Sequence, residues 1–278
     1  MSSRTLRVGA DRTVRFHDTG GSASALTVIW HHGTPQTGQI IEPLAAAAAE
    51  RNIRMVSCAR PSYPGSSPLP GRTVADSAAD AIRVADFLGI DQFAAMAASG
   101  GGPHAIACAA LAPNRVVAVA TLAGIAPYTR DFDWFAGMAS PGGLRAALAG
   151  RAERARYAAV DEFDETSFTD RDWEALAGSW SALGADAQEG SAGGPDGQID
   201  DDVAYIAPWG VSLAGVAAPV LVVQGGRDRV VPATHGRWLA GQLPGAEFLF
   251  RPDDGHISIL AEVPAALEWL LRSARESR

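Results

Sequence analysis

The sequence lacks the features of a nucleic-acid binder, a secreted protein or a membrane protein. Its 278 residues carry 31 acidic side chains and 23 basic ones, all of them arginines, and the formal net charge is −8. No basic stripe is available to neutralise phosphates, so we expect no nucleic-acid partner. No apolar run reaches the ~18 residues of a membrane span, and the N-terminal residues lack the apolar core of a signal peptide. We therefore expect a cytoplasmic protein with no membrane partner.

Cysteines and metal-binding patterns are also scarce. Cys58 and Cys108 are the two cysteines, and each lies inside an apolar segment. We expect them to be buried free thiols in a reducing compartment, not a disulfide framework. The sequence contains no H-E-x-x-H, no CxxC and no carboxylate cluster at ligand spacing, so we expect no metal site. The glycines at 100–102 lack the G-x-G-x-x-G spacing of a dinucleotide site, and we expect no cofactor.

Apolar runs alternate with alanine-rich helical stretches along most of the chain. With 47% hydrophobic and 19% charged residues, the composition is that of a globular protein. The alternation predicts an α/β fold, a mostly parallel eight-stranded sheet with helices on both faces. The predicted strands are 5–8, 12–18, 25–30, 53–59, 92–97, 116–122, 219–223 and 246–250. The predicted helices of this unit are 37–51, 74–88, 100–111, 232–242 and 256–275.

The alternation breaks between residues 125 and 210. That segment has helical pieces, predicted at 142–160 and 170–183, a glycine-rich loop at 190–197 and no convincing strand. We therefore divide the chain into an α/β core, residues 1–124 and 211–278, and a helical insertion, residues 125–210.

A tight turn of small residues follows the predicted strand 92–97. It reads Ala97-Ala98-Ser99-Gly100-Gly101 and leads into a helix. The pattern is that of G-x-S-x-G, with alanine at the position of the first glycine. Such a turn holds a serine in a strained backbone conformation and lifts its Oγ above the sheet. Ser99 is therefore the candidate nucleophile.

A serine hydroxyl needs a base and an acid that orients the base. The candidate base is His256, in a short loop after the predicted strand 246–250. The candidate acid is Asp228, in the loop after the predicted strand 219–223. Both follow strands of the same sheet, at the edge where open parallel sheets place their ligand sites. Each residue alone also fits a turn or a helix cap, but the order serine, aspartate, histidine differs from that of other serine-triad folds.

The negative oxygen of acyl transfer needs preorganised donors. The backbone N–H of Gly100 stands at the start of a helix, where free amides and the helix dipole favour negative charge. The loop after strand 25–30 reads His32-Gly33-Thr34-Pro35. Proline has no N–H, so Thr34 is the predicted second donor.

We predict no catalytic role for the other histidines. His104 is expected in the core and His31 beside the loop that carries Thr34, whereas His17 and His235 are expected on the surface.

At these motifs the chain resembles the α/β-hydrolase family, over nearly its whole length. The segment 32–35 is similar to the family's oxyanion loop, and residues 225–232 and 254–256 match its acid and histidine motifs. Residues 60–66 are similar to a family loop that is usually richer in glycine. The resemblance implies that residues 125–210 form a cap above a substrate cleft. Of the cap's aromatic residues we assign Trp134 and Trp209 to substrate binding, with packing of the cap against the core as the alternative.

The expected activity is that of a cofactor-independent serine esterase-like hydrolase. Its substrate would be a small, partly apolar acyl compound, namely a carboxylic ester, a thioester or a lactone. A carbon–carbon bond hydrolase and an aminopeptidase use the same three residues and stay open as alternatives. A non-catalytic ligand-binding protein on the same fold is the alternative of another class. A monomer and a homodimer are both compatible with the sequence.

Overall fold

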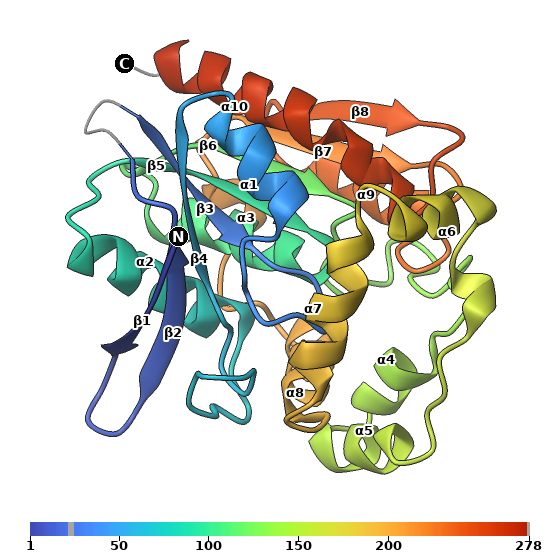
Figure 1. The fold of residues 1–278 in the computed structure, drawn as a ribbon. Coiled ribbons are helices and arrows are strands. Elements are labelled where there is room, and N and C mark those ends of the chain that lie inside the picture. Colours follow the sequence, from blue (N-terminus) through green and yellow to red (C-terminus); the bar gives the residue numbers. More distant parts are fainter. Residues whose placement is uncertain (22–24, 277–278) are drawn as a thin grey trace.

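The computed structural model describes residues 1–21 and 25–276, and its centre is an eight-stranded sheet (Figure 1). The strand order is β1-β2-β4-β3-β5-β6-β7-β8. The β1–β2 and β2–β4 pairs are antiparallel and all other pairs are parallel, which confirms the predicted sheet. The strands are β1 (Ser2–Arg7), β2 (Thr13–Asp18), β3 (Leu26–His31), β4 (Ile53–Cys58), β5 (Phe93–Ala98), β6 (Val116–Leu122), β7 (Val220–Gly225) and β8 (Glu247–Arg251).

Helices cover both faces of the sheet. The central strands are apolar on both sides because successive side chains alternate between two buried layers. The helices of this unit are α1 (Glu42–Ala49), α2 (Val74–Phe87), α3 (Gly102–Leu111), α9 (Ala233–Gln242) and α10 (Val263–Glu276). In β5, for example, Ala95 packs in the layer that holds α2, α3 and α9, whereas Met96 packs in the layer of α1 and α10.

Between β6 and β7 the described chain forms helices and loops without a strand. We call α4 to α8 the inserted helices, and they gather on one side of the molecule (Figure 1). The division of the chain at 124/125 and 210/211 stays a prediction, and residues 277–278 of its last segment lie outside the described residues. The inserted helices are α4 (Gly142–Ala147), α5 (Arg151–Ala158), α6 (Asp170–Ala177), α7 (Ser181–Ser191) and α8 (Asp196–Ile206).

Several predicted helix boundaries were wrong, and glycines explain most of them. Gly38, at φ +84°, lies against the Ala59 backbone, so the first helix begins only at Glu42. Gly150, at φ +99°, divides the predicted helix 142–160 into α4 and α5. Gly178 leaves helical geometry at φ −112° and ψ −118°, and separates α6 from α7. Glycine adopts such non-helical conformations more readily than other residues, and they end an α-helix.

Two histidines expected on the surface are buried. His17 is 5% exposed within β2, and His235 is fully buried in α9. The imidazole of His235 bridges the Ala126 N–H and the Trp134 carbonyl, at 3.3 and 2.8 Å. These backbone contacts come from a segment more than 100 residues away, and no local pattern indicates them. Burial lowers the pKa of His235 to about 4.

Both cysteines are buried and unpaired, as predicted. Burial raises the pKa of the Cys108 thiol to about 12. None of the helices in the described part of the chain has both the length and the hydropathy needed to cross a bilayer.

The turn after β5 leaves no room for a side chain at Gly101. A Cβ built on Gly101 would lie 2.0 Å from the carbonyl oxygen of His31, an atom of the β3 backbone. Because a backbone atom cannot move aside as a flexible side chain can, the close approach of β3 to this turn requires glycine.

Gly101→Ala is therefore expected to destabilise the protein by roughly 3 kcal/mol. The matched control is Gly184→Ala on α7, where an added Cβ meets nothing within 4 Å. That change should stabilise the protein by up to about 1 kcal/mol, because alanine favours the helix. Urea unfolding of the three proteins measures both effects. Equal stability of Gly101→Ala and the wild type would show that the turn is not tightly packed.

Candidate active site

Ser99 stands at the apex of the turn between β5 and α3. It opens a short 3₁₀ turn, Ser99–Gly101, with a backbone φ of +52°. This left-handed conformation is uncommon for a residue other than glycine and is a form of strain found at functional sites. Ala97, at the position of the first glycine in the usual pattern, is fully buried within β5. The strand therefore accommodates its methyl group.

The structure brings Ser99, His256 and Asp228 together. The His256 Nε2 lies 2.9 Å from the Ser99 Oγ, and its Nδ1 lies 2.8 Å from the Asp228 Oδ2. A carboxylate only accepts hydrogen bonds, so the Nδ1 carries the proton and donates it toward Asp228. The Nε2 is then free to accept the hydroxyl proton of Ser99.

The carboxylate of Asp228 is fixed by its own loop. Its Oδ1 accepts hydrogen bonds from the N–H groups of Val230 and Val231, at 2.9 and 2.8 Å. The side-chain amide of Gln224 lies 3.3 Å from Oδ2. These contacts leave Oδ2 pointing at the imidazole, which explains how one aspartate in a loop can hold a defined direction.

The charge around His256 favours its protonated form. Burial alone would lower the pKa of this histidine, because desolvation disfavours the imidazolium. The negative charge and hydrogen bond of Asp228, together with the charge of Asp172, outweigh burial and raise the pKa above its ordinary value. The imidazole is therefore a stronger base than a free histidine.

The loop after β3 lies directly beside Ser99. A Cβ built on Gly33 would be 3.5 Å from the Ser99 Cβ. The Gly33 N–H donates to the side-chain oxygen of Gln36, and Pro35 has no N–H. The Thr34 N–H therefore stays the predicted second donor of this loop. The Gly100 carbonyl accepts a hydrogen bond from the Tyr205 hydroxyl at 2.9 Å, which orients the peptide between Gly100 and Gly101.

Trp134 and Trp209 are both buried, at 2% and 4% exposure, within the same apolar layer as α2 and α3. The indole N–H of Trp134 donates to the carbonyls of Ala126 and Pro127, and that of Trp209 donates to Tyr205. Each ring has its polar group satisfied within the fold. These contacts favour packing over substrate binding for both residues.

A buried ion cluster beside the Thr34 loop was missed by the sequence analysis. Asp201 of α8 is fully buried and accepts hydrogen bonds from Arg60, Arg72, Tyr63 and Thr34, at 2.6 to 2.7 Å. Burial alone would raise the pKa of Asp201, but the two guanidinium groups lower it far below its usual range. Asp201 is therefore ionised and fixes the Thr34 hydroxyl.

Two further aspartates of the inserted helices reach loops around Ser99. Asp186 of α7 binds the side chains of Gln36 and Thr37. Asp172 of α6 accepts hydrogen bonds from the backbone N–H groups that follow His256. One sequence signal existed, because Thr169 and Asp172 have the spacing of a helix capping box. Nothing in the sequence indicates which loops these carboxylates meet.

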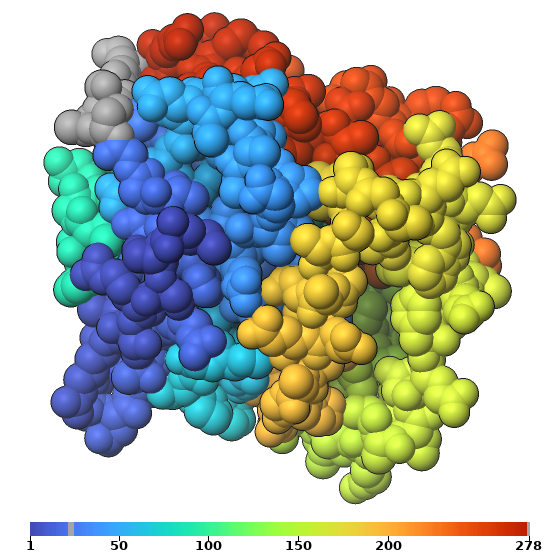
Figure 2. Space-filling view, in the orientation of Figure 1, coloured from blue at the N-terminus to red at the C-terminus, as the bar shows by residue number. Residues whose placement is uncertain are grey.

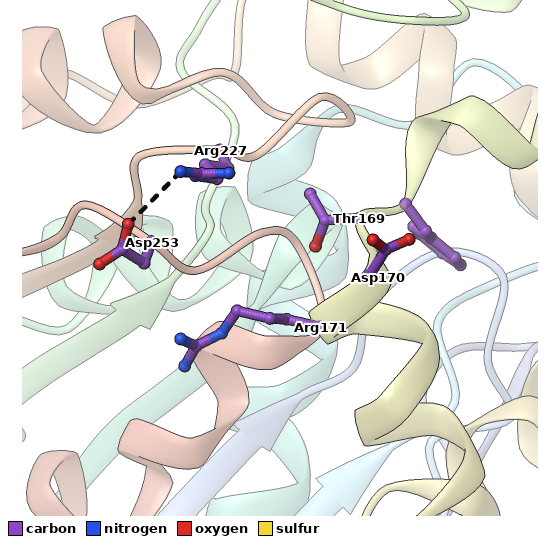
Figure 3. A pocket seen from close by; sticks show the side chains of 6 residues that line it. Thr169, Asp170, Arg171, Arg227 and Asp253 are labelled. Carbon is purple, nitrogen blue, oxygen red and sulfur yellow. Dashed lines mark ion pairs between the residues drawn. The ribbon is translucent and has the colours of Figure 1, made fainter.

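A surface pocket of about 470 Å³ opens next to the loops that carry Asp228 and His256 (Figure 3). Arg227 and Asp253 form an ion pair at 3.6 Å across one wall, and the start of α6 forms the other. The molecular surface is also hollowed between α7–α8 and α4–α5 (Figure 2). Within the described ranges, no three His, Cys, Asp or Glu side chains gather as ligands for a metal ion.

Solved structures of similar fold cover almost the whole chain. A bromoperoxidase from Bacillus anthracis has 20% identity and a TM-score of 0.78, over 98% of this chain and 100% of its own. A thermophilic esterase from Thermogutta terrifontis has 20% identity and a TM-score of 0.72, over 99% and 100%. The enol-lactonase from Burkholderia xenovorans LB400 has 19% identity and a TM-score of 0.70, over 95% and 97%. No curated protein matches the sequence.

The sequence profile of a family described as alpha/beta hydrolase fold matches residues 27–263. The match spans every strand from β4 to β8, nearly all of β3, the serine turn and the loops of Asp228 and His256. It agrees with the resemblance predicted from the sequence motifs and with the strand order of the sheet. The chain belongs to the α/β hydrolase fold family.

Proposed function

We propose that the protein is a cofactor-independent serine hydrolase that cleaves a carboxylic ester, a thioester or a lactone through an acyl-enzyme on Ser99. The observation that carries the proposal is the chain of hydrogen bonds from Asp228 through His256 to the Ser99 hydroxyl, at 2.8 and 2.9 Å. These distances are within the range for proton transfer between a nucleophile and its general base.

In the first step His256 takes the hydroxyl proton while the Ser99 Oγ attacks the carbonyl carbon of the substrate. Asp228 stabilises the imidazolium that forms and keeps its Nδ1–H in place. The imidazolium then gives its proton to the leaving alcohol or thiol, and the acyl group stays on Ser99. Water, deprotonated by His256, then attacks the acyl carbon. The bond between that carbon and the Ser99 Oγ breaks, the imidazolium returns its proton to Oγ, and the carboxylic acid leaves.

The negative oxygen that forms during both steps needs donors, and the backbone N–H groups of Thr34 and Gly100 are our candidates. Gly100 follows Ser99 directly in the chain, and the Thr34 loop lies beside Ser99, with a Cβ built on Gly33 3.5 Å from the Ser99 Cβ. In this proposal both N–H groups face the same oxygen. Arg60 holds the Thr34 loop through the carbonyls of His32 and Gly33. A rigid loop keeps such donors preorganised, so little energy is spent on reorganisation during the reaction.

The inserted helices, in this proposal, form a cap above the site and border the cleft that receives a small, partly apolar acyl substrate. The names of two structures of similar fold, an esterase and an enol-lactonase, agree with cleavage of an ester or a lactone. Nothing about Asp228, His256 or Ser99 requires a metal or an organic cofactor for this chemistry.

Ser99→Ala should abolish labelling by a fluorophosphonate probe and lower the hydrolysis of short p-nitrophenyl esters by roughly 10⁴-fold or more. The control is Ser181→Ala, an exposed serine at the start of α7, which should leave both signals unchanged. Labelling is read by intact-protein mass spectrometry. Label retained in Ser99→Ala would refute the nucleophile, and a wild-type protein inert to probe and esters would favour a non-catalytic binder.

The rate should depend on pH through His256, since the base works only when neutral. Because its pKa is raised, kcat/KM should fall as pH drops, with a midpoint above the ordinary histidine value of about 6.5. Asp228→Asn should lower the rate by about 10³–10⁴-fold, since it disturbs the tautomer of the base. The test is a pH series from 5 to 9 with a p-nitrophenyl ester. A flat profile from pH 5 to 8 would exclude histidine as the base.

A further inference from the structure

Asp172 stands out among the buried charged groups that the proposed mechanism does not use. It lies in the first turn of α6 and is fully buried. Its Oδ2 accepts hydrogen bonds from the Thr169 N–H and hydroxyl, both at 2.9 Å, and so caps the helix. A cap of this kind uses one carboxylate oxygen and leaves the other available.

The second oxygen of Asp172 binds the loop that carries His256. Its Oδ1 accepts hydrogen bonds from the Ile257 N–H at 2.8 Å, the Ser258 N–H at 2.7 Å and the Ser258 hydroxyl at 2.9 Å. The Ser258 hydroxyl oxygen in turn accepts from the Gly255 N–H at 2.8 Å. The backbone on both sides of His256 is thus attached to one carboxylate.

The loop packs closely against the carboxylate of Asp172. A Cβ built on Gly255 would lie 2.0 Å from the Asp172 Oδ2, so only glycine fits beside the carboxylate. The hydrogen bonds to a charged acceptor are stronger than neutral ones, and here they are shielded from water. They fix the position from which the imidazole extends toward Ser99.

The chain contains a matched reference for this arrangement. Asp76 forms the same capping box with Thr73 at the start of α2, with hydrogen bonds of 2.8 Å to the Thr73 N–H and hydroxyl. Asp76 is exposed and caps only its helix. What distinguishes Asp172 is therefore its burial and its contacts with the His256 loop, not the cap itself.

We propose that Asp172 is a positioning residue for His256: it holds the loop on both sides of the imidazole and supplies, in addition to Asp228, a second buried negative charge near the ring. Its part in hydrolysis rests on the proposed function, whereas its effect on the imidazole does not. Because Asp172 belongs to an inserted helix, the placement of α6 and that of the base are linked.

The charges around His256 are consistent with this role. Asp228 and Asp172 both raise the pKa of His256 against the effect of burial. The pKa of Asp172 is itself lowered, since its hydrogen bonds outweigh its burial, and the carboxylate is ionised at neutral pH. The nearby cations are already paired, Arg171 with Asp254 at 2.8 Å and Arg227 with Asp253 at 3.6 Å. Each pair has a net charge near zero and therefore changes the electrostatic potential at His256 little.

The electrostatic part is tested by NMR titration of the His256 imidazole in the Ser99→Ala protein, which needs no activity. Asp172→Asn keeps an oxygen acceptor but removes the charge. The His256 titration midpoint should then fall by roughly 0.5–1.5 pH units, as expected for a carboxylate across an effective dielectric between protein and water. Asp76→Asn makes the same change in the matched cap and should leave the midpoint in place. An unchanged midpoint in Asp172→Asn would overturn the proposal.

The positioning part is tested by the pH dependence of kcat/KM on a p-nitrophenyl ester. Asp172→Asn should move the acid limb to lower pH with a small loss at the plateau. Asp172→Ala also removes the acceptor and should lower the plateau by about 10–100-fold, with KM little changed and circular dichroism confirming the fold. The proposal fails if the wild type has Ser99-dependent activity and both Asp172 variants have the same acid limb and the same plateau of kcat/KM as Asp76→Asn. An inert wild type would instead refute the proposed hydrolase and leave the titration result standing.

Discussion

The close approach of β3 to the turn after β5 is the constraint on which the site depends. Gly101 lies so near the His31 carbonyl that no side chain fits between them. This approach lets Ser99 adopt φ +52° at the apex of the turn and places the Thr34 loop beside it. The imidazole of His256 then meets the Ser99 Oγ at 2.9 Å. A bulkier turn would separate these groups, whatever their chemistry.

Buried carboxylates attach the inserted helices to this site. Asp172, Asp186 and Asp201 come from α6, α7 and α8, and each binds a loop next to Ser99. Desolvation of a buried carboxylate offsets much of the energy gained from its hydrogen bonds or ion pairs, so these contacts contribute less to net stability than their number indicates. Removing the donors, by contrast, leaves a buried charge without compensation. We interpret these aspartates as determinants of geometry: they specify one arrangement of helices and loops.

The sheet and the candidate residues Ser99, Asp228 and His256 could be predicted from the sequence because both follow from local rules. Buried strands of a parallel sheet are continuous apolar runs, and loops after such strands meet at one edge. Ser99, Asp228 and His256 each follow one of these runs. The small residues on both sides of Ser99 also indicated a tight turn around a nucleophile, because few purely structural needs call for a serine in such a turn.

Other features depended on contacts between distant segments and could not be predicted. Asp201 belongs to a run of three aspartates typical of a solvated helix, yet it is fully buried because Arg60 and Arg72 meet it across the fold. His235 was expected at the surface, but the segment around Ala126 covers it. The helix breaks at Gly150 and Gly178 were missed because the surrounding sequence has strong helical preference.

In the proposed mechanism Ser99 bonds covalently to an acyl carbon while the Thr34 and Gly100 N–H groups hold the developing negative oxygen. A crystal structure of the protein after reaction with a fluorophosphonate tests it most directly. We expect a bond from phosphorus to the Ser99 Oγ, with a phosphoryl oxygen within hydrogen-bond distance of both N–H groups. An adduct on another residue, or a phosphoryl oxygen pointing away from Thr34 and Gly100, would contradict it.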